Sequence, residues 1–255
     1  MAPSDFDARF LGHFTTFNDS ATSPPASGSS WIVTEKLYEQ AVYLTKENFD
    51  NGVGLPLTAG LFLCHLEEDP AQIAFMRIYY QIPVTGTEDD LAKLAQQVIE
   101  PKVCSEREAF KQLMAQDCTA VPHYLGYQEP HDLVPGGYID YLVWEKVPGE
   151  SLTEEFFWSL DGQTRDDIRA KFRAAFEDIM RCGVESYPPR ISKVIYDQST
   201  GDVSTDKSSR ISGFRQGWPV IDELKWSDDL YVLYGLAMSP KEQWGWYDHP
   251  KNWTI

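Results

Sequence analysis

Adjacent acidic residues are the first side chains in this sequence that could do chemistry. Paired carboxylates with further acids nearby can hold Mg²⁺ against a diphosphate, as a metal-dependent terpene cyclase requires. The chain has three Asp-Asp pairs, Asp89-Asp90, Asp166-Asp167 and Asp228-Asp229. The last two pairs each lie at the start of a helical pattern, where carboxylates complement the helix dipole. Neither has the companion acids of a diphosphate site, so the sequence gives weak support to such a cyclase.

The signatures of common hydrolases and nucleotide-binding enzymes are missing from the sequence. It contains no HExxH, no GxSxG, no P-loop and no GxGxxG after a strand. Its five histidines are scattered without metal-ligand spacing: His13, His65, His123, His131 and His249. Its four cysteines form no CxxC pair and lie in or beside apolar runs: Cys64, Cys104, Cys118 and Cys182. We therefore predict buried free thiols, and neither a metal nor another cofactor.

Basic and hydroxyl side chains in three short stretches of the sequence are the remaining candidates for a functional site. Arg77 lies in AFMRI, Arg190 and Lys193 lie in YPPRISKVIYD, and Ser212 lies in ISGF. Cationic and hydroxyl donors of this kind suit a carbonyl or a carboxylate on an organic molecule.

The overall charge restricts the partners of the chain. Its 255 residues include 22 basic and 39 acidic side chains, which gives a net charge of −17. Such a chain repels phosphate backbones and anionic membranes, so we expect no nucleic-acid partner. There is no run of about 18 apolar residues, and the N-terminus has no apolar core, so we expect neither membrane insertion nor a signal peptide. The prediction is a globular cytoplasmic protein.

Residues 1–30 are predicted to be an N-terminal segment followed by a flexible linker. An apolar pattern at helical spacing precedes the linker and predicts a short amphipathic segment. Its members are Phe6, Phe10, Leu11, Phe14 and Phe17. The stretch 18–30, NDSATSPPASGSS, has low complexity and predicts a mobile linker.

Residues 31–147 are predicted to form a β-rich lobe that contains one helix. Strand patterns occur in 55–66, 71–83, 121–128 and 136–149, and the first two are joined as a hairpin by EEDP. Between the two pairs of strands, SEREAFKQLMAQ places its apolar residues on one face of a helix, with Ser105 as a candidate N-cap.

Residues 148–255 are predicted to form a mainly helical lobe with a Trp-rich tail. The longest helical pattern covers 164–184, with Thr164 as its N-cap and Gly183 at its end. Short strands follow, and the phrase VPGESL reads as a hinge between the lobes. The order of elements predicts an α+β fold with two lobes.

Five phrases, in this order and spacing, resemble the protein-kinase-like fold. They are AFMRIYYQIP, EREAFKQL, VPHYLGY, YLVWEKVPGESL and CGV…KVIYD…TGDV…ISGF, and they cover about residues 55 to 215. The resemblance is to aminoglycoside- and choline-phosphotransferase relatives, and more narrowly to a group of fungal kinase-like proteins. Because only about forty residues follow Ser212, it implies a truncated C-terminal lobe, with the tail tryptophans as candidates to roof the cleft.

The resemblance also shows which catalytic positions have changed. Arg77 stands where the strand lysine belongs and Glu106 where its helix partner belongs, so this ion pair is the part of the machinery that could survive. Pro188 replaces the catalytic aspartate, while Lys193 and Ser212 replace the two magnesium ligands. Proline offers no base and a lysine ammonium repels Mg²⁺. We therefore expect no kinase activity.

The same resemblance implies that eight side chains meet in one cleft. Arg77 and Lys193 are the candidate catalytic residues, because a cationic donor can polarise an acceptor group. The candidate substrate-binding residues are Glu106, Trp144, Glu145, Tyr187, Arg190 and Ser212. A cleft with cations and aromatic walls but no metal ligands suits a small apolar organic molecule.

Two functions of different classes follow from this cleft. In the first, the protein catalyses a metal-free cyclisation, cycloaddition or isomerisation of an apolar metabolite. Fungal relatives are consistent with specialised, or secondary, metabolism. In the second, the chain is a catalytically inactive pseudokinase that serves as a binding scaffold or regulator. A residual small-molecule phosphotransferase is the third alternative.

Overall fold

The computed structural model describes residues 14–17, 29–97, 105–128, 139–197, 209–212, 214, 217–220, 224–239 and 253–254. The chain divides into two compact units. Unit 1 comprises residues 1–104 and 124–146, and unit 2 comprises residues 105–123 and 147–255.

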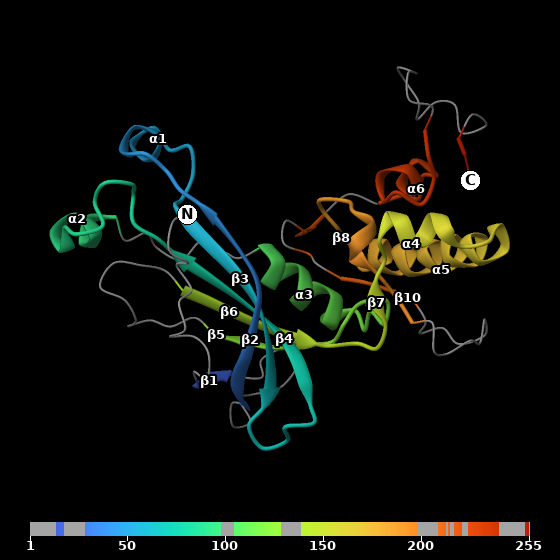
Figure 1. Ribbon diagram of the computed structural model, residues 1–255, viewed down its shortest axis with the longest axis horizontal. Helices are drawn as coiled ribbons and strands as arrows, with labels where there is room; N and C mark the ends of the chain where they lie inside the picture. The colour runs from blue at the N-terminus through green and yellow to red at the C-terminus, as the bar shows by residue number, and fades with distance from the viewer. Residues whose placement is uncertain are drawn as a thin grey trace. The chain divides into compact units, whose positions relative to one another are not determined.

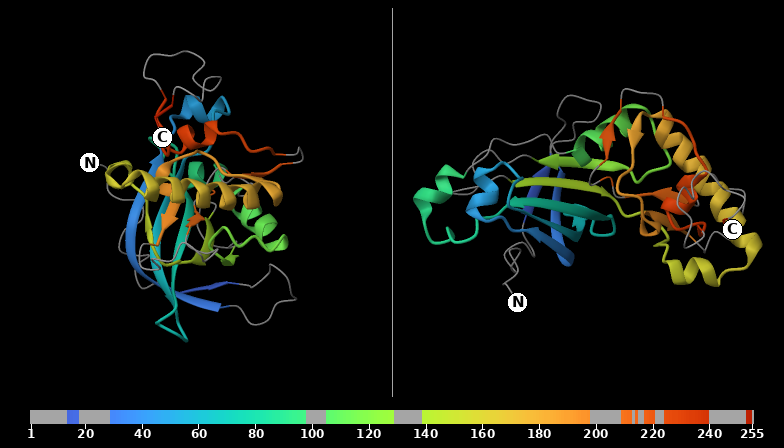
Figure 2. Two further views of the ribbon diagram at one scale, coloured as in Figure 1. Left: turned by 90° about the vertical axis from the view of Figure 1, so that its right-hand side faces the viewer. Right: turned by 90° about the horizontal axis from the view of Figure 1, so that it is seen from above.

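The strands of unit 1 form one twisted antiparallel sheet (Figures 1 and 2). They are β1 (Phe14–Phe17), β2 (Ser29–Val42), β3 (Leu57–Leu66), β4 (Ile73–Gln81), β5 (Tyr124–Gln128) and β6 (Ile139–Glu145), in the order β1-β2-β3-β4-β6-β5. The β3–β4 pairing runs from Leu57↔Gln81 to His65↔Ile73, which confirms the predicted hairpin. Two short helices, α1 (Lys46–Asp50) and α2 (Leu91–Gln96), belong to the same unit.

The N-terminal prediction is wrong where the structure tests it. Phe14 and Phe17 lie in β1, an extended strand that pairs antiparallel with the start of β2. Helical spacing of apolar residues is a local signal, and here pairing with another strand overrides it. The other members of the pattern and residues 18–28 of the predicted linker lie outside the described residues. The last two residues of the predicted linker, Ser29 and Ser30, are not part of a linker, because they belong to β2 and pair with β1.

The apolar core of unit 1 lies on one face of this sheet. Alternate residues of β4 contribute Ala74, Met76 and Ile78, and all three are buried. Alternate residues of β6 contribute Ile139, Tyr141 and Val143 to the same cluster. Because side chains alternate between the two faces of a strand, the odd-numbered residues of β4 and the even-numbered residues of β6 project from the opposite face.

Unit 2 contains the longest helices and two small sheets. Its helices are α3 (Ser105–Ala115), α4 (Glu154–Ser159), α5 (Gly162–Arg181), the 3-10 helix η2 (Ile191–Lys193) and α6 (Asp229–Leu233). Its strands are β7 (Glu150–Ser151), β8 (Val184–Glu185), β9 (Val194–Tyr196), β10 (Ser209–Ile211) and β11 (Trp218–Pro219). They form the sheets β10-β9-β7 and β11-β8. The division drawn from the sequence places α3 with the β-rich lobe, whereas its contacts place it in unit 2.

Helix α5 organises the core of unit 2. It begins earlier than predicted, because the Asp161 carboxylate and not Thr164 caps it, accepting a hydrogen bond of 3.0 Å from the Thr164 backbone N–H. Its end is as predicted, with Gly183 at φ +70° after the last turn. The buried residues of the predicted stripe are Ile168, Phe172, Ala175, Phe176 and Ile179. This apolar face carries the packing of the unit.

An aromatic cluster covers one side of α5. The rings of Phe172 and Phe176 contact Trp226, Tyr231 and Tyr234, with centroids 4.9 to 6.1 Å apart. The tail residue Trp226, which is half-buried, therefore packs against the core of unit 2, and its indole N–H donates to Asp228 at 2.7 Å. Trp244 and Trp246 lie outside the described residues.

The three described cysteines are buried free thiols, as predicted. Burial raises the pKa of Cys64 to about 12 and also raises the pKa of Cys118 and Cys182. Cys104 lies outside the described residues. No described helix is both long enough and apolar enough to cross a membrane.

Candidate functional site

Arg77 and Trp144 form the cationic part of the site in unit 1. Arg77 lies on β4 and Trp144 on β6, on the face opposite the apolar core. The guanidinium carbon of Arg77 stands 5.3 Å from the centroid of the Trp144 ring, and both residues are buried. A desolvated cation–π contact of this kind contributes roughly 1–2 kcal/mol and fixes the plane of the guanidinium. Glu145, half-buried, ends the same strand.

Asp140 is a buried acid on this sheet face that the sequence analysis did not select. It is fully buried on β6 and pairs in register with Tyr79, two residues from Arg77 along β4. A buried carboxylate needs a cation or hydrogen-bond donors nearby, because desolvation disfavours its charge. The signal in the sequence was an aspartate inside the apolar strand IDYLVWE.

Glu106 belongs to the first turn of α3 in unit 2 and is fully buried. Its helix packs within that unit, where the Phe110 ring meets Phe214 edge-on at 5.6 Å. Arg77 belongs to unit 1, so the ion pair between Arg77 and Glu106 stays a prediction.

The loop between β8 and β9 brings Lys193 and Ser212 together. Lys193 is buried at the end of η2, and its ammonium donates to the Ser186 hydroxyl at 3.4 Å. The Ser212 backbone N–H donates to the Lys193 carbonyl at 2.8 Å, and its hydroxyl lies 3.4 Å from the same oxygen. The two other predicted residues of this loop, Tyr187 and Arg190, are exposed. Hydrogen bonds therefore link Lys193 to both Ser186 and Ser212.

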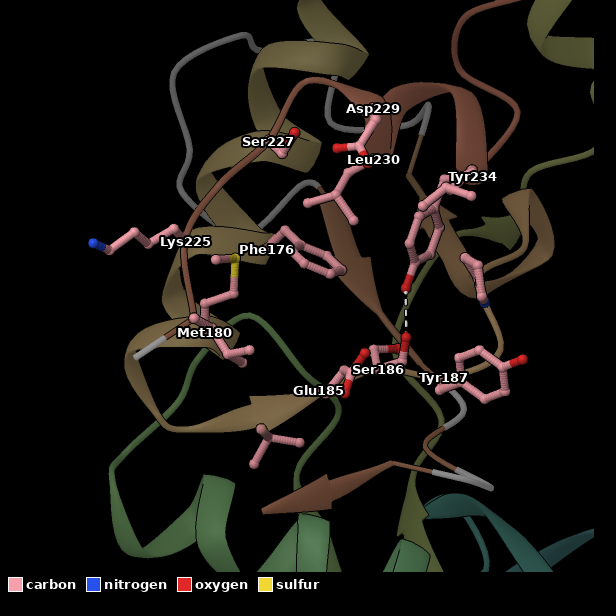
Figure 3. A pocket seen from close by; sticks show the side chains of 14 residues that line it. Phe176, Met180, Glu185, Ser186, Tyr187, Lys225, Ser227, Asp229, Leu230 and Tyr234 are labelled. Carbon is pink, nitrogen blue, oxygen red and sulfur yellow. Dashed lines mark hydrogen bonds between the residues drawn. The ribbon is translucent and has the colours of Figure 1, made fainter. Parts of the chain in front are cut away.

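A cavity of about 360 Å³ lies beside this loop, entirely within unit 2 (Figure 3). Its apolar wall is formed by Phe176, Met180, Val184, Leu224, Leu230 and Leu233. Tyr187 lines it, and so do Ser186 and Tyr234, whose phenol donates to the Ser186 carbonyl at 3.2 Å. Burial raises the pKa of Tyr234 to about 12, so this phenol stays neutral at physiological pH.

The sequence analysis did not identify this cavity. Phe176 and Met180 lie within the predicted helix 164–184, and Asp229 lies at the start of another helical pattern. A spacing of three residues between Leu230 and Leu233 was the available signal, because it puts both on one helical face. Which residues of α5 face Leu230 and Leu233 depends on the path of the chain between the end of α5 and the start of α6.

The chemistry available in the described residues is that of hydrogen-bond donors, carboxylates, aromatic faces and apolar walls. Within those residues no group of three or more His, Cys, Asp or Glu side chains is arranged to hold a metal ion. The cationic groups, Arg77 and Lys193, are buried and held by a ring and by a hydroxyl respectively. Such fixed donors can orient or polarise an acceptor without moving.

Comparison with known proteins adds little to these observations. No family model matches the chain, and no curated protein matches it. Among solved structures, the Cydia pomonella granulovirus kinase PK-1 is similar to 78% of the chain, with 10% sequence identity and a TM-score of 0.46. The chain spans 59% of that kinase. The comparisons therefore show no family for this chain, and its own structure shows a mixed α+β protein with an antiparallel sheet.

Proposed function

We propose that this protein is a kinase-like protein that does not transfer phosphate and binds a small apolar organic molecule. The order of elements supports the kinase-like part. A strand with a buried cation (β4) is followed by a helix with a buried acid (α3), two strands (β5 and β6), a long helix (α5) and a loop between short strands. This is the order that the five phrases of the sequence imply.

The observation that carries the proposal is the bonding inside the β8–β9 loop. Lys193 takes the place of a magnesium ligand, and its ammonium is buried against the Ser186 hydroxyl. A positive charge at this point repels Mg²⁺, whose ligands are oxygen atoms with negative charge. Pro188 brings no carboxylate that could orient a nucleophile. Phosphoryl transfer would lack both its metal ligands and its acid.

Mg²⁺ and ATP together should leave the melting temperature of the protein unchanged. A ligand that binds only the folded state raises that temperature by mass action, so the absence of a rise indicates that the nucleotide does not bind. The measurement is a thermal-shift titration, with Mg²⁺ alone and ATP alone as controls. A rise that depends on both components, or transfer of the labelled γ-phosphate to any acceptor, would show that the proposal is wrong.

The finer proposal is that the protein catalyses a metal-free cyclisation, cycloaddition or isomerisation in specialised metabolism. Arg77, held flat against Trp144, would donate to a carbonyl of the bound molecule. Such a donor acts where negative charge develops in the transition state. Lys193 would serve as the second donor, and the aromatic walls would hold the reactive conformer.

Arg77→Ala and Lys193→Met should each reduce turnover of any compound that the protein converts by about 10² to 10³-fold, as loss of one oxyanion donor does. Arg77→Lys keeps the charge and should retain part of the activity. Turnover would be followed by mass spectrometry on apolar polycyclic compounds, and circular dichroism would confirm folding. Unchanged turnover in both Arg77→Ala and Lys193→Met would remove these two residues from the mechanism.

An inactive scaffold is the second candidate function, and one feature of unit 1 favours it. The second half of β2 pairs on one side with β3, while β1 pairs only with its first residues. Leu37, Tyr38, Val42 and Tyr43 lie on or just after this half and are 40 to 51% exposed. An edge strand with exposed apolar side chains can pair with a strand of another protein. Formation of a stable complex without turnover would favour this alternative.

A further inference from the structure

We propose that the cavity of unit 2 is a binding site for an amphipathic amine, a molecule with an apolar body and one protonated nitrogen. This inference goes beyond the proposed function, because the cavity is lined by neither Arg77 nor Lys193. Its volume of about 360 Å³ falls within the usual range of small-molecule sites, which begins near 300 Å³.

The apolar walls of the cavity indicate that the ligand has an apolar body. Figure 3 shows Leu230 directed toward the rings of Phe176 and Tyr234, which contact one another, with Met180 on the α5 side. These side chains offer contacts and no hydrogen bonds, apart from the Tyr234 phenol, which is already bonded to the Ser186 carbonyl. A hydrocarbon or aromatic body is therefore favoured over a sugar or a nucleotide.

The head group is indicated by a carboxylate without a partner. Asp229 lines the cavity at the start of α6, and its Oδ1 is buried without a hydrogen-bond partner among the described residues. No described cation forms an ion pair with it. The lining also includes a second carboxylate, Glu185, which is exposed to solvent and has no ion pair in the described part of the chain.

The cationic residue of the lining does not neutralise these acids. Figure 3 shows the Lys225 side chain extending away from the cavity, and Lys225 is exposed. A buried or half-buried carboxylate gains most from a cationic donor, because charge-assisted hydrogen bonds are stronger than neutral ones. An ammonium group on the ligand would satisfy Asp229, whereas a carboxylate in the same place would be repelled.

Three probes with one body and different head groups test this assignment at pH 7. They are 4-phenylbutylamine, 4-phenylbutan-1-ol and 4-phenylbutanoate, each titrated into the full chain by calorimetry. We expect the amine to bind at least about tenfold more tightly than the carboxylate, with the alcohol between them. Equal affinity of the amine and the carboxylate, or no binding of the amine, would overturn the proposal.

Asp229→Asn should bring the affinity for the amine down to about that for the alcohol. The matched control is Asp228→Asn, which removes the same charge one residue away, does not line the cavity and keeps an oxygen for the Trp226 indole. The control should bind the amine as the natural chain does. An equal loss in both variants would mean that the amine responds only to the net charge of the protein.

Leu230→Trp is the test of location. The larger side chain should fill the cavity and abolish binding of all three probes, while circular dichroism shows that unit 2 remains folded. If this variant fails to fold, the Asp229 and Asp228 pair still decides the question. Retained binding in a folded Leu230→Trp variant would place the amine elsewhere. None of these variants alters Arg77 or Lys193, so failure here leaves the proposed function to its own tests.

Discussion

Replacing Phe172 by alanine should lower the free energy of unfolding of unit 2 by about 4 kcal/mol, in the range of buried Phe→Ala substitutions. The side chain is fully buried in the middle of α5. Its ring contacts four others, with centroid distances of 5.5 Å to Phe176, 6.1 Å to Trp226 and Tyr231, and 4.9 Å to Tyr234. Truncation removes all four contacts and leaves a cavity that the short segment 224–234 cannot close without moving.

The stability of unit 2 must be measured separately from that of unit 1, because a chain with two units need not unfold in one step. Hydrogen exchange resolved by peptide does this, and protection of α5 should fall while that of the β3–β4 hairpin is kept. Tyr187→Ala is the control, since that ring is 51% exposed and its loss should cost less than about 0.5 kcal/mol. A loss below about 1 kcal/mol for Phe172→Ala would show that the cluster does not carry the packing of the unit.

Replacing Gly149 by alanine should destabilise unit 2 by about 3 kcal/mol, because strain in the backbone adds to a steric clash. Gly149 has φ +99°, a conformation that L-residues rarely adopt. A Cβ atom at this position would lie 2.8 Å from the carbonyl carbon and oxygen of Tyr196. Those atoms belong to the backbone of β9, which pairs with β7, so they cannot move away independently.

Gly162→Ala is the matched control in the same unit. Gly162 opens α5, has no positive φ, and a Cβ there would meet no atom within 4 Å. Alanine is the better helix former, so this variant should be neutral or gain up to about 1 kcal/mol. Chemical denaturation of both variants gives the comparison. Similar stabilities for the two would contradict the conformational role of Gly149.

The elements with strong local patterns could be predicted from the sequence. The β3–β4 hairpin could be predicted because two apolar strands flank a short polar turn. Helix α5 could be predicted because its apolar stripe continues from Ile168 to Ile179. The end of α5 could also be predicted from a local signal, because Gly183 is the residue type that favours the left-handed conformation found after the last turn. Its N-cap was misplaced by three residues, because Asp161 and Thr164 are both capable caps.

The candidate site could be predicted only in part. The phrases that carry the kinase-like resemblance indicated that Lys193 and Ser212 would lie together, and the structure brings them within hydrogen-bonding distance through the Lys193 carbonyl. The stacking of Arg77 on Trp144 was not expected, although both residues were selected. It depends on the register of β4 and β6, which pairs Arg77 with Leu142 and so sets Trp144 diagonally across from it.

Amino-acid patterning alone establishes the charge of the protein and predicts its mixed α+β character. These properties depend on residue type and on spacings of a few positions, which a linear sequence contains. Tertiary packing decides the cavity and the position of Asp229 at its wall, where the Asp229 Oδ1 has no hydrogen-bond partner among the described residues. They arise because α6 and the segment before it return to α5, and the distance between residues 176 and 230 in space is set by long-range contacts that no local pattern specifies.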